Sequence, residues 1–214
     1  MRHPILVLLV FCGVALPGVT AETPARPSPP GSRRALLVAV SRYDRGQKRP
    51  WRNLTSYLDS QAIRSVLIRR FGFRPQDVLV VSDAGATRRG IIGAFENHLI
   101  APAKPGDVLV FHFAGHGQPI ADDNGDELDG LDESLVPYDY VGNSAVEGSR
   151  TNIRDDGLNE LLARATAKLR PGGGDHGPTQ GSTLVLLDCC HAGSATRGRQ
   201  VARGRGWDER LDGP

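Results

Sequence analysis

A short apolar run near the end of the chain leads directly into two cysteines and a histidine, and this stretch constrains the fold most. Residues 183–187 (TLVLL) are too few for a typical helix, and they stop at Asp188-Cys189-Cys190-His191. Such a run is typical of a buried strand. Because open α/β sheets keep reactive groups at the carboxyl ends of their strands, we expect both thiols to lie at such an end.

A second apolar run has the same design. Residues 107–114 (DVLVFHFA) end at a histidine between two glycines, Gly115-His116-Gly117. A thiol and an imidazole at two strand ends form a candidate nucleophile and base, because a base makes the thiolate at neutral pH. The glycines let a substrate backbone approach and let a main-chain N–H point into the site. His112, which alternates with apolar neighbours, is interpreted as a core or supporting histidine.

Other interpretations use the same residues. His191 follows the thiols and could be the base instead, although a residue next to a nucleophile usually points the other way. The thiols and histidines could also bind zinc by ligand type, but adjacent cysteines lack the two-residue gap that lets both reach one metal. The plainest alternative is that Cys189 and Cys190 are small buried side chains.

The rest of the chain alternates short apolar runs with helical patterns. Gly72 would end the first helix, and Thr87 or the residue before it would cap the second. This alternation predicts an α/β domain with a mostly parallel sheet and helices on both faces, whereas residues 135–136 suggest only a hairpin arm. Further strands are predicted at residues 35–40 and 77–81, and helices at residues 54–71, 87–100 and 155–169.

The two ends of the chain differ from this pattern. Residues 1–21 combine a basic start, an apolar run and a small-residue ending, which predicts a secretory signal peptide and a secreted or periplasmic protein. An uncleaved membrane anchor is the alternative, but the run is short for a span and stable insertion is not expected. Residues 22–34 predict a disordered Pro-rich linker, residues 35–196 the domain, and residues 197–214 an Arg/Gly-rich loop or tail.

Charge and cysteine content exclude some classes. The net charge of +2 over 214 residues gives no argument for nucleic acid, and no nucleic-acid partner is expected. Without the leader the chain keeps only Cys189 and Cys190, which is unlike a disulfide-stabilised scaffold. About 190 residues then remain, enough for one domain with its own core.

The two motifs together resemble those of the caspase family, and metacaspases more closely than animal caspases. They read FAGHG at residues 113–117 and DCCHAG at residues 188–193, in the family's order. The resemblance runs from about Arg34 to Ser194. It implies a caspase-like three-layer α/β sandwich. It also implies a cysteine endopeptidase that acts on protein or peptide substrates through an acyl-enzyme and needs no cofactor for the chemistry.

The resemblance assigns roles to single residues. His116 matches the catalytic histidine and Cys190 the nucleophile, while Cys189 becomes a core or supporting residue. The backbone N–H groups of Gly117 and Cys190 would form the oxyanion hole.

Two carboxylates carry the prediction of specificity. Asp188 precedes the nucleophile by two residues, and Asp59 lies in a stretch similar to the family's Asn-Asp-Ala helix start. In metacaspases these positions are similar to the acidic floor of the pocket for the residue before the scissile bond, so cleavage after Arg or Lys is expected. A buried carboxylate pair prefers such a cation. The alternatives are an exposed helix residue for Asp59 and a strand-end cap for Asp188.

The acidic residues of the chain suggest a calcium site. The acidic loop at residues 122–133 fails the EF-hand template, because Glu127 stands where that loop needs glycine, and its plain interpretation is a solvated loop. The resemblance instead implies an activating calcium ion at Asp139, Asp155 and Asp156. The family's fourth acidic ligand has no match, since Arg197 stands near its position.

Two departures from the family keep other functions open. Ala114 replaces the serine common before Gly-His-Gly, and the family's sheet continues with strands after its Cys block. We therefore expect either that the sequence is a fragment of a longer protein or that a complementing segment or chain completes the sheet. The rival hypotheses are a non-catalytic caspase-like module for binding or signalling, with or without calcium, and a metal-binding protein.

Overall fold

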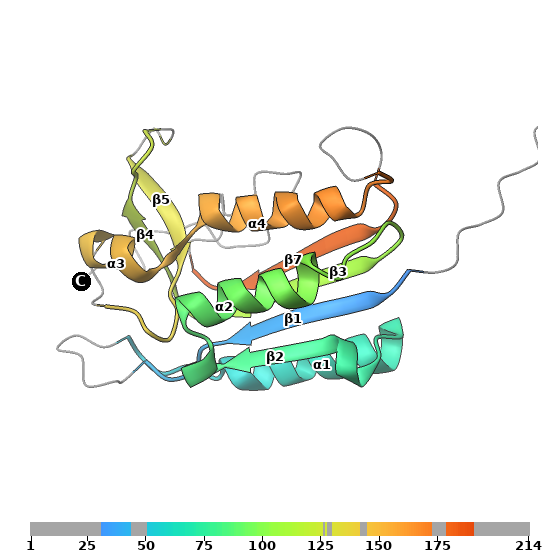
Figure 1. Ribbon diagram of the computed structural model, residues 1–214. Coiled ribbons are helices and arrows are strands. Elements are labelled where there is room, and N and C mark those ends of the chain that lie inside the picture. The colour runs from blue at the N-terminus through green and yellow to red at the C-terminus, as the bar shows by residue number, and fades with distance from the viewer. Residues whose placement is uncertain are drawn as a thin grey trace, which may run out of the picture.

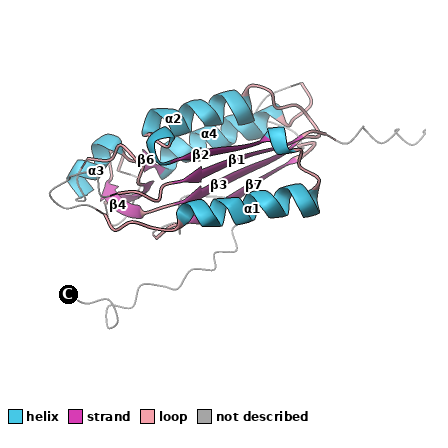
Figure 2. Ribbon diagram, turned by 90° about the horizontal axis from the view of Figure 1, so that it is seen from below, coloured by secondary structure: helices cyan, strands magenta, loops and turns pink. Residues whose placement is uncertain are grey.

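The computed structural model of the protein describes residues 31–43, 51–125, 127, 130–141, 145–172 and 179–190. The predicted signal peptide, most of the predicted linker, His191 and the Arg/Gly-rich tail lie outside these residues. The described residues form three layers, in which a sheet lies between helices (Figures 1 and 2).

A parallel sheet of four strands forms the middle layer, in the order β2-β1-β3-β7. The central strands β1 and β3 are almost wholly buried, as their continuous apolar sequences require, because helices cover both of their faces. The predicted parallel sheet is confirmed. Its strands are β1 (Arg33–Ala39), β2 (Val78–Ser82), β3 (Val108–Ala114) and β7 (Ser182–Asp188).

Strand β1 begins inside the predicted linker. Arg33 and Arg34 pair with the first residues of β3, and the Arg34 guanidinium donates to the Asp107 carboxylate at 2.7 Å. Asp107 is only 4% exposed and also accepts the Ser32 N–H. A buried carboxylate needs such partners, so the two arginines belong to the sheet and the predicted boundary at residue 34 is corrected to residue 32.

Helices cover both faces of this sheet (Figure 2). Helix α1 (Ser56–Phe71) lies on one face and ends at Gly72, whose φ of 69° is left-handed. On the other face lie α4 (Asp155–Lys168) and α2 (Arg88–Ala94), which continues as the π-helical turn η3 (Phe95–Ile100). The Thr87 hydroxyl caps α2 by accepting the Gly90 N–H at 3.0 Å. All three predicted helices are confirmed; the remaining short turns are η1 (Pro75–Asp77) and η2 (Asp83–Gly85).

A small antiparallel sheet, β4-β5-β6, lies beyond the carboxyl ends of the main strands (Figure 1). The sequence indicated only one short arm of it, because polar and charged residues interrupt its apolar pattern. The elements are β4 (Gly117–Ala121), β5 (Leu131–Leu135), β6 (Ile153–Arg154) and the unpredicted helix α3 (Ala145–Thr151).

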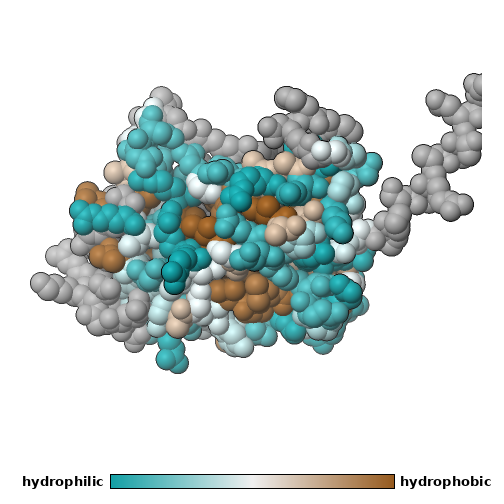
Figure 3. Space-filling view, in the orientation of Figure 1, coloured by the Kyte–Doolittle hydropathy of each residue, from teal (hydrophilic) through white to brown (hydrophobic). Residues whose placement is uncertain are grey.

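The main core lies between the sheet and the layer of α2, η3 and α4, where the Phe95 and Phe111 rings meet at a tilt of 51° with centroids 5.1 Å apart. Polar side chains cover much of the outer face of this layer, and apolar ones show between the helices (Figure 3). Strand β7 is different: among the described residues it pairs only with β3, and Leu184 is 48% exposed. No helix in the described part of the chain has the length and apolar character to cross a membrane.

Candidate functional site

The two reactive motifs lie side by side because β3 and β7 pair in parallel, with Ala114 opposite Asp188. Beyond the strands, the Gly115 N–H donates to the Asp188 carbonyl at 3.2 Å. A Cβ atom on Gly117 would stand 2.1 Å from the Cys190 carbonyl oxygen, so only glycine permits this approach. The residues on both sides of His116 therefore touch the segment that carries the thiols.

A main-chain carbonyl determines which nitrogen of His116 can act as a base. The Nε2 atom lies 2.7 Å from the carbonyl oxygen of Arg52. A carbonyl only accepts, so Nε2 carries the hydrogen and Nδ1 of the neutral ring keeps the lone pair. Burial lowers the pKa of His116, and the contact with Arg52 opposes this only in part. The imidazole is thus neutral at pH 7, as a base must be.

Two aromatic rings contact the His116 ring. The indole of Trp51 stacks on it with centroids 4.7 Å apart and planes at 27°, and Tyr43 meets it edge-on at 4.6 Å. The Tyr43 hydroxyl also accepts the His116 N–H at 2.9 Å. Neither residue was predicted from the sequence. Their only signal was that Tyr43 and Trp51 are aromatic residues outside every predicted strand and helix, in a chain with 6% aromatic residues.

Hydrogen bonds between the aromatic residues hold the surroundings of the His116 ring in place. Tyr43 is fully buried, and its hydroxyl donates to the Val136 carbonyl at 3.1 Å. The Tyr140 hydroxyl donates to the Tyr43 carbonyl and accepts the Trp51 N–H at 3.3 Å. Burial raises the pKa of Tyr43 far above its ordinary value, so the phenol stays neutral.

The two neighbouring thiols have different surroundings. Cys189 packs against the main core, and burial, with smaller effects of Cys190 and Asp188, raises its pKa to about 12. Cys190 is exposed. Both cysteines follow the end of β7 at Asp188, where the chain leaves the sheet. Of the two, Cys190 is the accessible nucleophile candidate, and Cys189 has the supporting environment predicted for it.

The two carboxylates predicted to bind substrate both lie near one buried histidine. His112 is 3% exposed, and its Nδ1 lies 3.4 Å from the Ser60 hydroxyl of α1. Burial lowers the pKa of His112, while the charges of Asp188 and Asp59 act in the opposite direction. Both carboxylates are exposed. The charges of both carboxylates therefore act on the same buried histidine.

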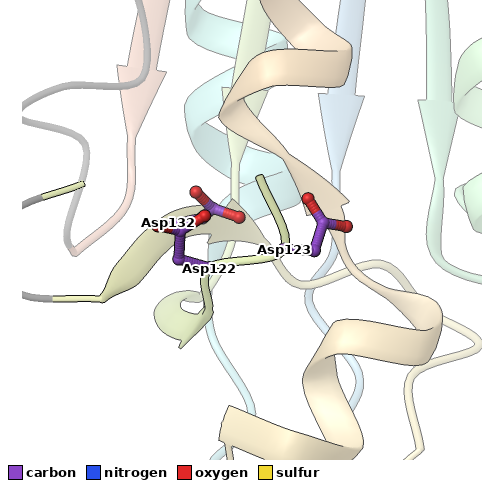
Figure 4. Close-up of side chains that lie close together, drawn as sticks. All are labelled: Asp122, Asp123 and Asp132. Carbon is purple, nitrogen blue, oxygen red and sulfur yellow. The ribbon is translucent and has the colours of Figure 1, made fainter. Parts of the chain in front are cut away.

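Three carboxylates converge at the hairpin of β4 and β5 (Figure 4). Oxygens of Asp122, Asp123 and Asp132 all lie within 4.8 Å of one another. Arg154 forms ion pairs with Asp132 and, at 3.1 Å, with Asp123. Asp132 is 1% exposed, so the interpretation of this loop as solvated is wrong for Asp132: its register opposite Ile120 turns it inward.

Two of the predicted calcium ligands lie beside this cluster. Asp155 is buried at the start of α4, and burial, together with the charges of Asp156 and Asp132, raises its pKa. Asp156 accepts the side-chain N–H of Asn124 at 2.7 Å. Asp155 and Asp156 thus share one negative region with Asp132.

The third predicted ligand, Asp139, has another contact. Its carboxylate accepts the Arg88 N–H at 2.8 Å, at the start of α2, where a negative charge stabilises a helix. The donor chemistry around Asp132 fits a calcium ion, which takes carboxylate oxygens. Arg154 already supplies one positive charge to this cluster, so a cation there would share the carboxylates with a guanidinium.

Comparisons with known proteins agree with the arrangement of these elements. A family model described as metacaspase, peptidase C14 domain, matches residues 33–197. Metacaspase III c of Phaeodactylum tricornutum is 33% identical over 180 residues, which are 78% of this chain and 45% of that protein. Metacaspase-2 of Arabidopsis thaliana is 31% identical over 175 residues, which are 77% of this chain and 35% of that protein.

A solved structure shows the same fold. The crystal structure of protein GSU0716 from Geobacter sulfurreducens aligns with a TM-score of 0.55 at 24% identity, covering 76% of this chain and 52% of that one. This likeness concerns the fold alone. The chain spans less than half the length of the two curated relatives described above.

The environments of the two thiols predict selective alkylation. At pH 8 a thiol with a pKa of about 12 is thiolate in only about one molecule in ten thousand, so iodoacetamide should modify Cys190 and spare Cys189. Peptide mass spectrometry of the folded protein measures this. The control is the urea-unfolded protein, in which both thiols should react. Equal labelling of the two in the folded protein would contradict the assignment.

Proposed function

The chain belongs to the metacaspase family of peptidase C14 domains, and from this premise we propose that it is a cysteine endopeptidase that cleaves after Arg or Lys. The observation that carries the proposal is the pairing of β3 with β7, which places the glycines around His116 against Asp188 and Cys190. An exposed thiol on the segment that contacts the loop of a neutral, anchored imidazole supports nucleophilic catalysis.

In the proposed mechanism, Nδ1 of His116 takes the proton from the Cys190 thiol. The thiolate then attacks the carbonyl carbon of the scissile peptide. Main-chain N–H groups of Gly117 and Cys190 hold the negative oxygen of the tetrahedral intermediate. The imidazolium returns its proton to the leaving amine, and water releases the acyl-enzyme as a free carboxylate. The Arg52 carbonyl supports this cycle, because it holds Nε2–H in both protonation states of the ring.

The proposed specificity for basic residues depends on Asp59 and Asp188. Both are exposed, and both act electrostatically on His112 between them. Burial keeps His112 neutral near pH 7, so it does not compete with a substrate cation for these carboxylates. An Arg guanidinium would gain charge-assisted hydrogen bonds there.

Substitution of the nucleophile tests the proposed chemistry. Cys190→Ala should abolish cleavage of an Arg-ending fluorogenic peptide, because no other exposed thiol among the described residues lies beside His116. His116→Gln should lower kcat at least about 100-fold. Cys189→Ala is the matched control and should retain most activity. Turnover that persists in Cys190→Ala, or no labelling of Cys190 by an Arg-ketone electrophile, would favour a non-catalytic module.

Removal of the pocket charges tests the specificity. Asp188→Asn and Asp59→Asn should each lower kcat/KM for an Arg-ending peptide by about tenfold or more, because each removes a charged hydrogen-bond acceptor. The ratio of kcat/KM for the Arg-ending peptide to kcat/KM for a norleucine-ending peptide should fall in both variants. Glu160→Gln, an exposed change on α4, is the charge control and should leave both values unchanged. An unaltered Arg preference in Asp188→Asn would refute the pocket.

We also propose that calcium activates the protein by binding at Asp155 and Asp156. The contacts favour Asp132 as the third carboxylate, because its charge acts on Asp155, whereas Asp139 accepts a helix N–H. A cation there would stabilise the β4–β5 hairpin, and it would take no part in the bond cleavage.

The Asp155→Asn variant tests this site, because the burial of Asp155 predicts the direction in which the melting temperature changes. Burial raises the pKa of Asp155 above its unfolded value of about 3.9, so its contribution to stability is present below that pH and lost as pH rises. The variant should therefore melt at a higher temperature than the wild type at pH 7, by a margin that shrinks toward pH 4. Millimolar calcium should raise the melting temperature of the wild type and of Asp139→Asn, but not of Asp155→Asn. An equal calcium effect on all three would refute the site.

A further inference from the structure

Two consecutive residues outside any helix or strand enclose the imidazole of His116. Arg52 places its carbonyl oxygen 2.7 Å from Nε2, at the edge of the ring. Trp51 lays its indole against the face of the same ring, with centroids 4.7 Å apart and planes at 27°. The carbonyl alone leaves the ring free to rotate about the Nε2–O axis. A stacked indole removes that freedom.

Trp51 is itself held from two sides. Its main-chain N–H donates to the Tyr140 hydroxyl at 3.3 Å, and that hydroxyl donates to the Tyr43 carbonyl. Its side chain packs against the main core, and Tyr43 contacts the His116 ring at 61°. The indole therefore belongs to the rigid part of the site, and it can transmit that rigidity to His116.

Stacking also matters for the charge that His116 gains in the proposed mechanism. A cation over the face of an indole is attracted by the ring quadrupole, and tryptophan is the best partner for this contact. His116 is partly removed from water, which disfavours its charged form. The indole of Trp51, whose centroid lies 4.7 Å from that of the imidazole, replaces part of this lost solvation while His116 is protonated.

We propose that Trp51 is a positioning residue for His116: its indole fixes the plane of the imidazole, and with it the direction of Nδ1, and it stabilises the imidazolium. This role rests on the proposed peptidase function. Trp51 touches the base and not the scissile bond, so its removal should affect turnover and leave substrate binding unchanged.

The indole N–H makes a conservative substitution informative. The Trp51 Nε1 atom is buried and has no acceptor among the residues that the structure describes. Trp51→Phe therefore removes no hydrogen bond and keeps a stacking face. Trp51→Leu fills similar apolar space without that face. The pair separates stacking from simple packing.

Steady-state kinetics with an Arg-ending peptide test the role. Trp51→Phe should retain kcat within about threefold, whereas Trp51→Leu should lose about 10- to 100-fold in kcat with an unchanged KM. Circular dichroism checks that both variants are folded. Equal kcat in the wild type and Trp51→Leu would overturn the proposal. So would a loss that appears in KM alone, because that pattern would assign Trp51 to substrate binding.

Fluorescence gives a measurement that does not depend on activity. In Trp207→Phe, Trp51 is the sole tryptophan, and a stacked imidazolium quenches indole emission. Emission should fall as pH is lowered below about 6.5, because burial lowers the pKa of His116 from its ordinary value. Nearby Tyr43 stays neutral over this range because burial raises its pKa.

Adding His116→Gln should abolish this quenching, and its persistence in that variant would overturn the stacking. The two experiments also separate the two proposals. A wild-type protein that cleaves no peptide refutes the peptidase function, and His116-dependent quenching would then still support the contact with Trp51. Active enzyme without quenching, and with full activity in Trp51→Leu, refutes only the role of Trp51.

Discussion

The site depends on the register in which β3 and β7 pair. With Ala114 opposite Asp188, both strands end at the same level, and the loops beyond them meet around His116. Side chains alternate along a strand, so a shift of one residue would turn every side chain of β7 to the opposite face of the sheet. Strand pairing thus also fixes where the chain leaves the sheet, directly before Cys189 and Cys190. The apolar residues of both strands, buried between helices, hold that register.

Burial tunes the reactive groups in opposite directions within a short distance. It lowers the pKa of His116 and so keeps a neutral base at pH 7, and it raises the pKa of Cys189 and so keeps that thiol protonated. Cys190 lies at the surface, where substrate can reach it. Charge is costly away from water, and this one principle explains why the Cys189 thiol stays protonated and why the His116 imidazole stays neutral.

The small antiparallel sheet joins the reactive loop to the acidic cluster. Strand β4 begins at Gly117, directly after His116, and the Val136 N–H that follows β5 donates to the His116 carbonyl at 2.9 Å. Asp132 lies on β5 within this hairpin and pairs with Arg154. A charge bound or lost at the cluster acts on the same hairpin that supports the His116 loop. This continuity gives the calcium activation that we propose a physical basis.

Local sequence was enough for the strands of the main sheet, the three large helices and the placing of His116 and Cys190 at strand ends, because apolar periodicity and caps act over a few residues. Only the tertiary structure decided the strand order and the small sheet. It also decided the inward turn of Asp132 and the contacts of Trp51 and Arg52 with His116. The contact between Arg52 and His116 joins residues 64 apart in the chain. Such contacts form only when the sheet has brought distant loops together, so a pattern over a few neighbouring residues cannot predict them.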